Sequence, residues 1–200
     1  MTLRGAAVVL FALLVGACTS VERQPAPTAS LTPRDKQLLA NAPYQKVLPP
    51  DIYQRSIVDY AGTEKPGTIV VDTDKKYLYF VQDNGKAIRY GVTGGEEGLA
   101  FKGEAKVGRK AEWPTWTPTP EIKQRLAGVP NFVGPGPHNP MGARALYLYQ
   151  GNKDTLFRIH GTNQPEYIGQ AISSGCIRML NEDVIDLYTR VPPGTEVVVL

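Results

Sequence analysis

A histidine and a cysteine near the C-terminus are the residues of this sequence best suited to covalent chemistry. His160 ends the run TLFRIH, and Cys176 lies sixteen residues later (176 − 160 = 16), directly after Ser-Ser-Gly. A thiol is mostly protonated at neutral pH, so a nucleophilic cysteine needs a base or a cation beside it. Histidine meets this need because its pKa lies near neutral pH. From the spacing alone, a buried structural cysteine and an unrelated loop histidine are the favoured interpretation, and a thiol nucleophile with a histidine base is the alternative.

The residues around Cys176 favour attack of a thiol on a carbonyl group. Gly175 lets the backbone approach a substrate closely, because glycine has no Cβ. The backbone N–H groups around Cys176 could bind the oxygen that becomes negatively charged during such an attack. The segment Ser173–Met179, with the sequence SSGCIRM, therefore carries the features of an acyl-transfer site.

Short strands are expected to position these residues. Six runs rich in β-branched and aromatic residues are separated by turn signals, including Asp83-Asn84-Gly85. The runs are Thr68–Asp72, Tyr77–Val81, Lys86–Val92, Ala145–Gln150, Thr155–His160 and Thr195–Leu200. One helix is expected at Asn181–Val191, with Asn181 as its N-cap, a single apolar stripe, and Pro192-Pro193-Gly194 after its end. The pattern predicts a mostly β domain with one helix near the C-terminus.

Two segments rich in proline and glycine, Ala111–Glu121 and Val133–Gly142, are expected to be irregular loops between the strands. Long ordered loops on a β scaffold often carry binding sites. Trp113 and Trp116 in the first loop could line a groove, but packing in the core is the favoured interpretation for each. His138 in the second loop does not lie at the end of a strand, so it is interpreted as a surface or groove residue.

The first seventeen residues have the pattern of a signal peptide. Arg4 precedes the apolar run Gly5–Ala17, which is shorter than the roughly 20 residues that a membrane-spanning helix needs. The run ends in LVGAC, which resembles a bacterial lipobox, so we expect Cys18 to be the lipidated first residue of the mature chain. An ordinary signal peptide cut nearby is the alternative. With Cys18 lipidated, one thiol remains, Cys176 (2 − 1 = 1), and no internal disulfide is expected.

Residues 18–65 are predicted to be a lipid-anchored, proline-rich tether, and residues 66–200 the folded domain. The stretch from Thr19 to Pro50 contains six prolines and one short helix-like patch, Asp35–Ala42. A flexible coil of this length would span roughly 40 Å, which would carry the domain away from a membrane. The net charge of +3 is spread without a basic run, so nucleic-acid binding is not expected.

The segments HGTN, His160–Asn163, and SSGCIRM together resemble the signature of the L,D-transpeptidase catalytic domain family of the YkuD type. The resemblance extends over roughly residues 66–200 and includes the loop VGPGPHNPMG and the segment 181–200. It implies a mostly β fold, a mixed-strand β-sandwich or barrel-like catalytic domain with one helix on the C-terminal side. The family's turn rich in Thr, Pro and Gly is altered at Gly98–Gly108.

The resemblance also implies roles for individual residues. Cys176 would be the nucleophile and His160 the base, with the backbone carbonyl of Gly161 orienting the imidazole ring. Arg178 resembles an arginine that meets the carboxylate of the substrate; a salt bridge to a nearby acidic residue is the structural alternative. Many members have a second histidine where this chain has Ser174, so a role for a second imidazole is absent. The residues expected to bind or orient the substrate are Gly161, Ser174, Gly175 and Arg178.

The activity that the resemblance implies is transpeptidation of peptidoglycan without a metal or organic cofactor. Cys176 would attack the carbonyl of an L-configured centre, diaminopimelate, in a tetrapeptide stem, and the terminal D-alanine would leave. An amine of another stem or of an outer-membrane protein would resolve the thioester. A hydrolase of the same fold and a non-catalytic peptidoglycan-binding lipoprotein are the alternatives. The expected location is the cell envelope, facing the periplasm, and Thr19 after Cys18 favours the outer membrane.

Overall fold

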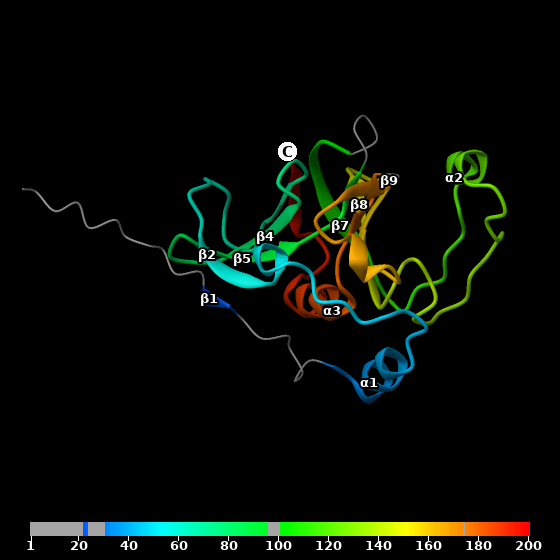
Figure 1. The fold of residues 1–200 in the computed structure, drawn as a ribbon. Coiled ribbons are helices and arrows are strands. Elements are labelled where there is room, and N and C mark those ends of the chain that lie inside the picture. Colours follow the sequence, from blue (N-terminus) through cyan, green and yellow to red (C-terminus); the bar gives the residue numbers. More distant parts are fainter. Residues whose placement is uncertain (1–21, 24–30, 96–100, 174) are drawn as a thin grey trace, which may run out of the picture.

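The computed structural model describes residues 22–23, 31–95, 101–173 and 175–200. In this part of the chain ten strands form one mixed sheet and two form a second, small sheet (Figure 1). The order in the large sheet is β1-β2-β5-β4-β3-β12-β7-β8-β9-β11. These strands are β1 Glu22–Arg23, β2 Ser56–Asp59, β3 Ile69–Asp72, β4 Tyr77–Val81, β5 Lys86–Gly91, β7 Gly103–Glu112, β8 Arg144–Gln150, β9 Lys153–His160, β11 Ile177–Arg178 and β12 Glu196–Val199. The predicted mostly β fold with mixed strands is confirmed.

Two pairs of neighbouring strands in the large sheet run parallel, β3 with β12 and β9 with β11. The small sheet pairs β6 (Gly94–Gly95) with β10 (Ala171–Ser173), also in parallel. An isolated bridge between Thr93 and Arg178 joins the two sheets. Strand β11, which directly follows Cys176, is therefore held on one side by β9 and on the other by Thr93.

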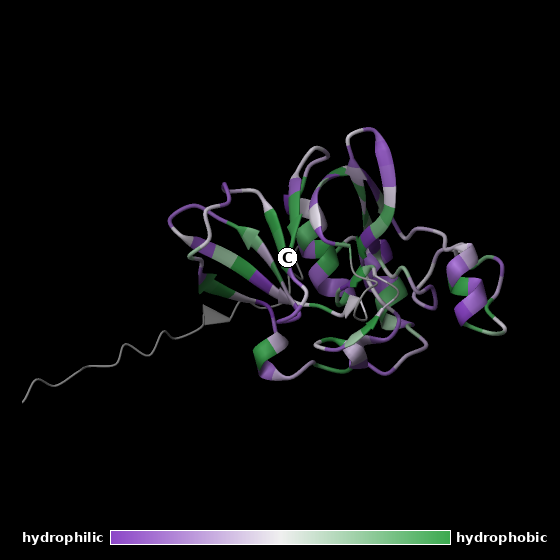
Figure 2. Cartoon of the chain, turned by 90° about the horizontal axis from the view of Figure 1, so that it is seen from above, coloured by the Kyte–Doolittle hydropathy of each residue, from purple (hydrophilic) through white to green (hydrophobic). Residues whose placement is uncertain are grey.

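The predicted helix near the C-terminus is α3 (Asn181–Arg190), which packs against β8 and β9 on one face of the sheet. Its buried Val184 and Leu187 belong to the main core. Figure 2 shows hydrophobic residues along the central strands and on this helix, and hydrophilic residues in the peripheral loops. The predicted N-cap is wrong, because Leu180 occupies that position. The side chain of Asn181 is bonded to other parts of the fold instead.

All six predicted strands are present, as β3, β4, β5, β8, β9 and β12. The turn between β4 and β5 is also as predicted: Asn84 and Gly85 have φ angles of 61° and 66°, and a type I′ hairpin turn requires positive φ at both positions. The central strand β7 was not predicted. Its buried residues are Ala105 and Val107, and most of the others are charged residues or glycine. The strand therefore lacks the β-branched and aromatic residues that mark strands in a sequence.

Residues 31–65 pack on the domain, which differs from the flexible tether expected there. Helix α1 (Pro33–Ala40) coincides with the helix-like patch, a 3₁₀ turn covers Asp51–Tyr53, and β2 joins the sheet beside β5. In Figure 1 this segment, coloured blue to cyan, passes α3 on its way from α1 to β2. Buried Leu39 of α1 contributes to a small apolar cluster with the rest of the domain. The expectation failed because these contacts are made with residues far along the chain. The predicted signal peptide and Cys18 lie outside the described residues.

The two predicted loops are joined to each other and to the core. Trp113 is 2% exposed and lies in an apolar cluster, which confirms the predicted core packing, and Trp116 is partly buried. The buried side chain of Asn139 bonds to backbone groups of both loops. The short helix α2 (Pro120–Arg125) begins where the first loop ends. None of the helices in the described residues has the length and apolar character needed to cross a membrane.

Candidate active site

His160 is the last residue of β9 and its side chain is buried. Ring Nδ1 lies 2.6 Å from the backbone carbonyl oxygen of Gly161. A carbonyl oxygen only accepts hydrogen bonds, so Nδ1 carries the proton and the lone pair of the neutral ring is on Nε2. This is the contact that the resemblance led us to expect at Gly161.

The surroundings of His160 keep its imidazole neutral. Burial, together with the nearby positive charge of Arg178, lowers the pKa of His160 to about 3. The backbone carbonyl groups of Gly161 and Met141 act in the opposite direction but do not outweigh burial. At neutral pH the ring is therefore free to accept a proton.

Cys176 is presented by a tight turn after β10. The hydroxyl of Ser173 donates to the carbonyl oxygen of Cys176 at 2.6 Å and accepts the N–H of Gly175 at 3.2 Å. Gly175 has a φ of 110°, a conformation that residues with a Cβ adopt only with strain. Gly175 thus has a conformational role in the turn, and its N–H is donated to Ser173. Ser174 lies outside the described residues.

Cys176 is a free cysteine of intermediate exposure. Burial raises its pKa, while a backbone N–H of Arg158 and the charges of Arg158 and Arg178 act in the opposite direction. With the thiol protonated and the imidazole of His160 neutral, the site is a thiol–imidazole pair, not a thiolate–imidazolium pair. The nucleophile must therefore be deprotonated during the reaction.

The parallel pairing of β9 and β11 brings the two reactive segments together. Arg178 lies opposite His160 in the ladder, and Ile177 lies opposite Ile159. The two isoleucines are buried in the main core. Because side chains alternate along a strand, Arg178 and His160 project on the face opposite to those isoleucines, and Cys176 directly precedes β11. The sequence segments HGTN and SSGCIRM thus meet on one face of the sheet edge.

Arg178 is not tied to an acidic residue in the part of the chain that the structure describes. Its guanidinium donates to Gln164 Oε1 at 3.3 Å, and burial lowers its pKa. Asp183, an acidic residue five positions further along the chain, has its carboxylate 3.5 Å from the guanidinium of Arg55 instead. The guanidinium therefore keeps donors available for a ligand.

Several residues that hold the turn after His160 were not found from the sequence. The N–H of Gly161 donates to the backbone carbonyl of Arg144 at 3.0 Å. The side chain of Asn181 accepts the N–H of Ala143 and donates to the carbonyl of Thr162, both at 2.8 Å. The sequence signal was present in Asn181, but it was interpreted as a helix cap.

The remaining candidates are placed away from the Cys–His pair or outside the described residues. His138 is exposed, and its backbone carbonyl accepts a hydrogen bond from Asn163. Of the altered turn Gly98–Gly108, residues 98–100 are outside the described residues. A cavity of about 850 Å³ lies beside Lys106 and other strand residues and includes neither His160 nor Cys176.

Comparisons with known proteins agree on the family. The sequence model of the L,D-transpeptidase catalytic domain, YkuD, matches residues 66–199. The probable L,D-transpeptidase ErfK/SrfK of Escherichia coli K12 is 35% identical over 69% of this chain and 45% of its own length. The chain spans about half the length of the first relatives that it matches.

Solved structures are also similar to this chain, among them the following two. One, from Brucella melitensis, is titled a probable carnitine operon oxidoreductase and is 50% identical, covering 77% of this chain and 96% of that one, with a TM-score of 0.51. That name belongs to the Brucella protein. The other is an Enterococcus faecium L,D-transpeptidase, 22% identical over 68% of this chain and 50% of that one, with a TM-score of 0.52, which shows the same fold. With the family match covering most of its length, this chain belongs to the L,D-transpeptidase catalytic domain (YkuD) family.

Proposed function

We propose that this protein is a cysteine acyltransferase, a peptidoglycan L,D-transpeptidase, with Cys176 as nucleophile and His160 as base. The observation that supports the proposal is the parallel pairing of β9 with β11, in which Arg178 lies opposite His160 and Cys176 directly precedes the paired residues. Membership of the family supports the same activity. Relatives named as probable L,D-transpeptidases also support it.

The reaction consists of two transfers of an acyl group. The neutral imidazole of His160 takes the proton of the Cys176 thiol while the sulfur attacks a carbonyl carbon of a peptide stem. The C–N bond to the terminal residue breaks, the imidazolium returns its proton to the leaving amine, and a thioester remains. An acceptor amine then attacks the thioester, gives its proton to His160, and restores the thiol. One amide bond replaces another, so no electrons and no net protons are consumed.

Arg178 makes His160 a stronger base when a donor is bound. The positive charge of Arg178 contributes to the low pKa of His160. A tetrapeptide stem ends in a free carboxylate, which a guanidinium can hold by two parallel hydrogen bonds. Pairing with the carboxylate offsets the charge that His160 experiences and raises the pKa of the imidazole. Donor binding and base strength are coupled in this way.

The proposed acceptor is an amine of a second stem peptide or of an outer-membrane protein. Residues 1–17 are the proposed signal peptide, and Cys18 is the proposed lipid attachment point of a lipoprotein that faces the periplasm. The sequence LVGAC and Thr19 support this placement, with the outer membrane favoured. Cys18→Ser is expected to release the protein from the membrane pellet while the activity of the domain is unchanged. Continued membrane association of this variant would indicate another anchor.

Mass spectrometry of muropeptides incubated with the purified protein tests the proposal. We expect a tetrapeptide donor to lose its terminal D-alanine, a 3–3 cross-linked dimer to form, and a donor thioester to be detected on Cys176. Release of a tripeptide without dimers would identify the hydrolase alternative. Peptidoglycan binding without any product would identify a non-catalytic lipoprotein.

A further inference from the structure

We infer that residues 31–65, which precede the region matched by the family, supply positioning residues to the active site. Two side chains of this segment, Asp35 and Tyr44, are linked by hydrogen bonds to the turn that follows His160. The inference rests on the proposed function, because it assigns these contacts to holding the catalytic base. It deepens that function by adding residues from outside the catalytic domain to the site.

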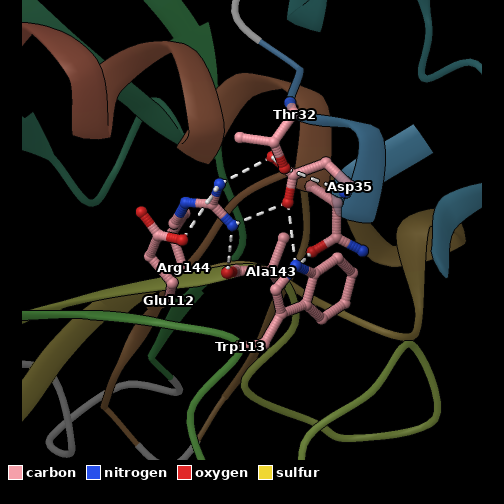
Figure 3. A network of polar contacts seen from close by, with 7 residues as sticks. Thr32, Asp35, Glu112, Trp113, Ala143 and Arg144 are labelled. Carbon is pink, nitrogen blue, oxygen red and sulfur yellow. Dashed lines mark hydrogen bonds and ion pairs between the residues drawn. The ribbon is translucent and has the colours of Figure 1, made fainter. Parts of the chain in front are cut away.

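The first link is a buried ion pair (Figure 3). The carboxylate of Asp35 accepts two hydrogen bonds from the guanidinium of Arg144, at 2.9 and 2.7 Å, and the side chains are 1% and 3% exposed. The indole N–H of Trp113 donates to the same carboxylate at 2.8 Å. Burial alone would raise the pKa of Asp35, but hydrogen bonds from Arg144 and Thr32 outweigh it, and the carboxylate stays ionised. The backbone carbonyl of Arg144 in turn accepts the N–H of Gly161 at 3.0 Å.

The second link passes through the amide of Asn181. Its Nδ2 donates to the hydroxyl oxygen of Tyr44 at 2.7 Å and to the carbonyl of Thr162 at 2.8 Å. Its Oδ1 accepts the N–H of Ala143 at 2.8 Å. A Cβ at Gly161 would collide with this Oδ1, so glycine is required for the amide to fit. Asn181 is thereby fixed between the N-terminal segment and the turn.

Both links end on the turn Gly161–Thr162, whose Gly161 carbonyl accepts Nδ1–H of His160. The N–H of Gly161 and the carbonyl of Thr162 lie on either side of that carbonyl along the backbone. Fixing both groups fixes the direction in which the Gly161 carbonyl points. This direction keeps the proton on Nδ1 and the lone pair on Nε2. A turn free to rotate would admit the other tautomer, which has no lone pair on Nε2.

A purely structural role is the competing explanation. Compared with apolar residues of the same volume, a buried ion pair is a weak source of stability. The N-terminal segment already has an apolar anchor in Leu39, which packs in a cluster with Trp113 and Ile185. The polar links therefore contribute the orientation of the turn, which apolar contacts do not specify.

Side-chain ¹⁵N NMR of histidine tests the inference without relying on turnover. The protein would carry Cys176→Ala to prevent reaction and His138→Gln so that His160 is the single histidine (2 − 1 = 1). With Asp35 and Tyr44 unchanged, we expect the tautomer protonated on Nδ1 alone. Tyr44→Phe and Asp35→Asn should each give a mixture of tautomers. One unchanged tautomer in both variants would overturn the inference.

Kinetics in the otherwise native chain separate positioning from stability. Tyr44→Phe removes one hydroxyl group and is expected to lower kcat about tenfold at unchanged donor KM, because a small misplacement of a catalytic group is costly. Tyr60→Phe is the matched control, since the Tyr60 hydroxyl, in the same segment, donates a 2.7 Å hydrogen bond to Glu64. The control should keep the native kcat. A lower Tm with unchanged kcat in Tyr44→Phe would contradict positioning.

The failure of the inference and that of the proposed function give different results. Suppose that the native protein forms no cross-links, that its His160 is protonated on Nδ1, and that Tyr44→Phe loses this tautomer. This result would refute the proposed function and retain the positioning network. If the native protein, Tyr44→Phe and Asp35→Asn all form cross-links at the same rate, the positioning network is refuted and the proposed function is retained.

Discussion

The two halves of the candidate site are held by different kinds of contact. The turn that carries Cys176 is closed by the hydroxyl of Ser173, three residues earlier in the chain. His160 is placed by a turn whose supports come from distant parts of the chain, and one of them, Arg144, is paired with Asp35 across 109 residues. The turn of the proposed nucleophile is thus closed locally, although the strand after it is paired with β9, while the turn of the proposed base depends on distant parts of the fold.

Removing the nucleophile should have the largest effect on activity and little effect on the fold. Cys176→Ala is expected to abolish cross-linking, because Cys176 is the one cysteine in the part of the chain that the structure describes. The thiol is small and partly exposed, so the free energy of unfolding should change by less than about 1 kcal/mol. Muropeptide analysis and thermal unfolding are the measurements. Turnover near the native rate would end the mechanism, and a collapse of the Tm would make Cys176 a core residue.

Removing the positive charge of Arg178 should have the next largest effect on activity. Arg178→Ala is expected to lower kcat/KM for the donor about ten- to a hundred-fold, which corresponds to about 1.5–3 kcal/mol for a charge-assisted contact. Arg178→Lys should recover only part of this loss, because an ammonium cannot form the paired hydrogen bonds.

The same variant has a signature in the pH profile. The charge of Arg178 helps to lower the pKa of His160, so Arg178→Ala should raise that pKa. Activity requires the neutral ring, and the acid limb of kcat/KM should therefore move to higher pH. If Arg178→Ala leaves the acid limb and the value of kcat/KM unchanged and lowers the Tm, Arg178 is a structural residue.

Weakening the turn that carries Cys176 should have a smaller effect, seen in the reactivity of its thiol. Ser173→Ala removes the hydroxyl that bridges Gly175 and Cys176 and is expected to slow alkylation of the thiol by iodoacetamide several-fold. Ser56→Ala is the matched control, because Ser56 is also buried and its hydroxyl has no partner among the described residues. Equal rates in the two variants would show that the local turn does not depend on the hydroxyl.

The smallest effect is expected at the second histidine. The side chain of His138 is exposed, and its contact with Asn163 is made through the backbone carbonyl. His138→Ala should therefore change donor kcat and KM by less than about twofold, as is usual for exposed positions. A tenfold loss would give the side chain of His138 a role in the site, in addition to the backbone contact that Met141 of the same loop makes with His160.

Features encoded by neighbouring residues could be predicted from the sequence, and features made by distant residues could not. The strands rich in β-branched residues and the turn at Asn84–Gly85 were found because a few adjacent residues specify them. The pair Cys176 and His160 was proposed from short motifs, and the parallel pairing of their strands is consistent with that proposal.

The packing of residues 31–65 shows the limit of local reasoning. The prolines of this segment suggested a coil, although Asp35 is a buried ionised residue whose partner, Arg144, is on strand β8. Asn181 is a second example. Its neighbours in the sequence predicted a helix cap, whereas its side chain forms hydrogen bonds with Tyr44 and Ala143. Partners at such separations follow from the fold, which the sequence pattern did not specify in detail.

Strand β2 has a consequence for any shortened form of this protein. It covers β5 through four residue pairs, Ser56–Asp59 against Lys86–Arg89. A fragment that begins at residue 66, where the family match begins, would leave the backbone N–H and C=O groups of β5 unpaired at a sheet edge. Such edges recruit strands from other molecules. The fragment would also lack Asp35, the carboxylate 2.7 Å from the guanidinium of Arg144, and would leave this guanidinium with Glu112 at 3.9 Å. We therefore expect the fragment to self-associate and the longer chain to remain dispersed.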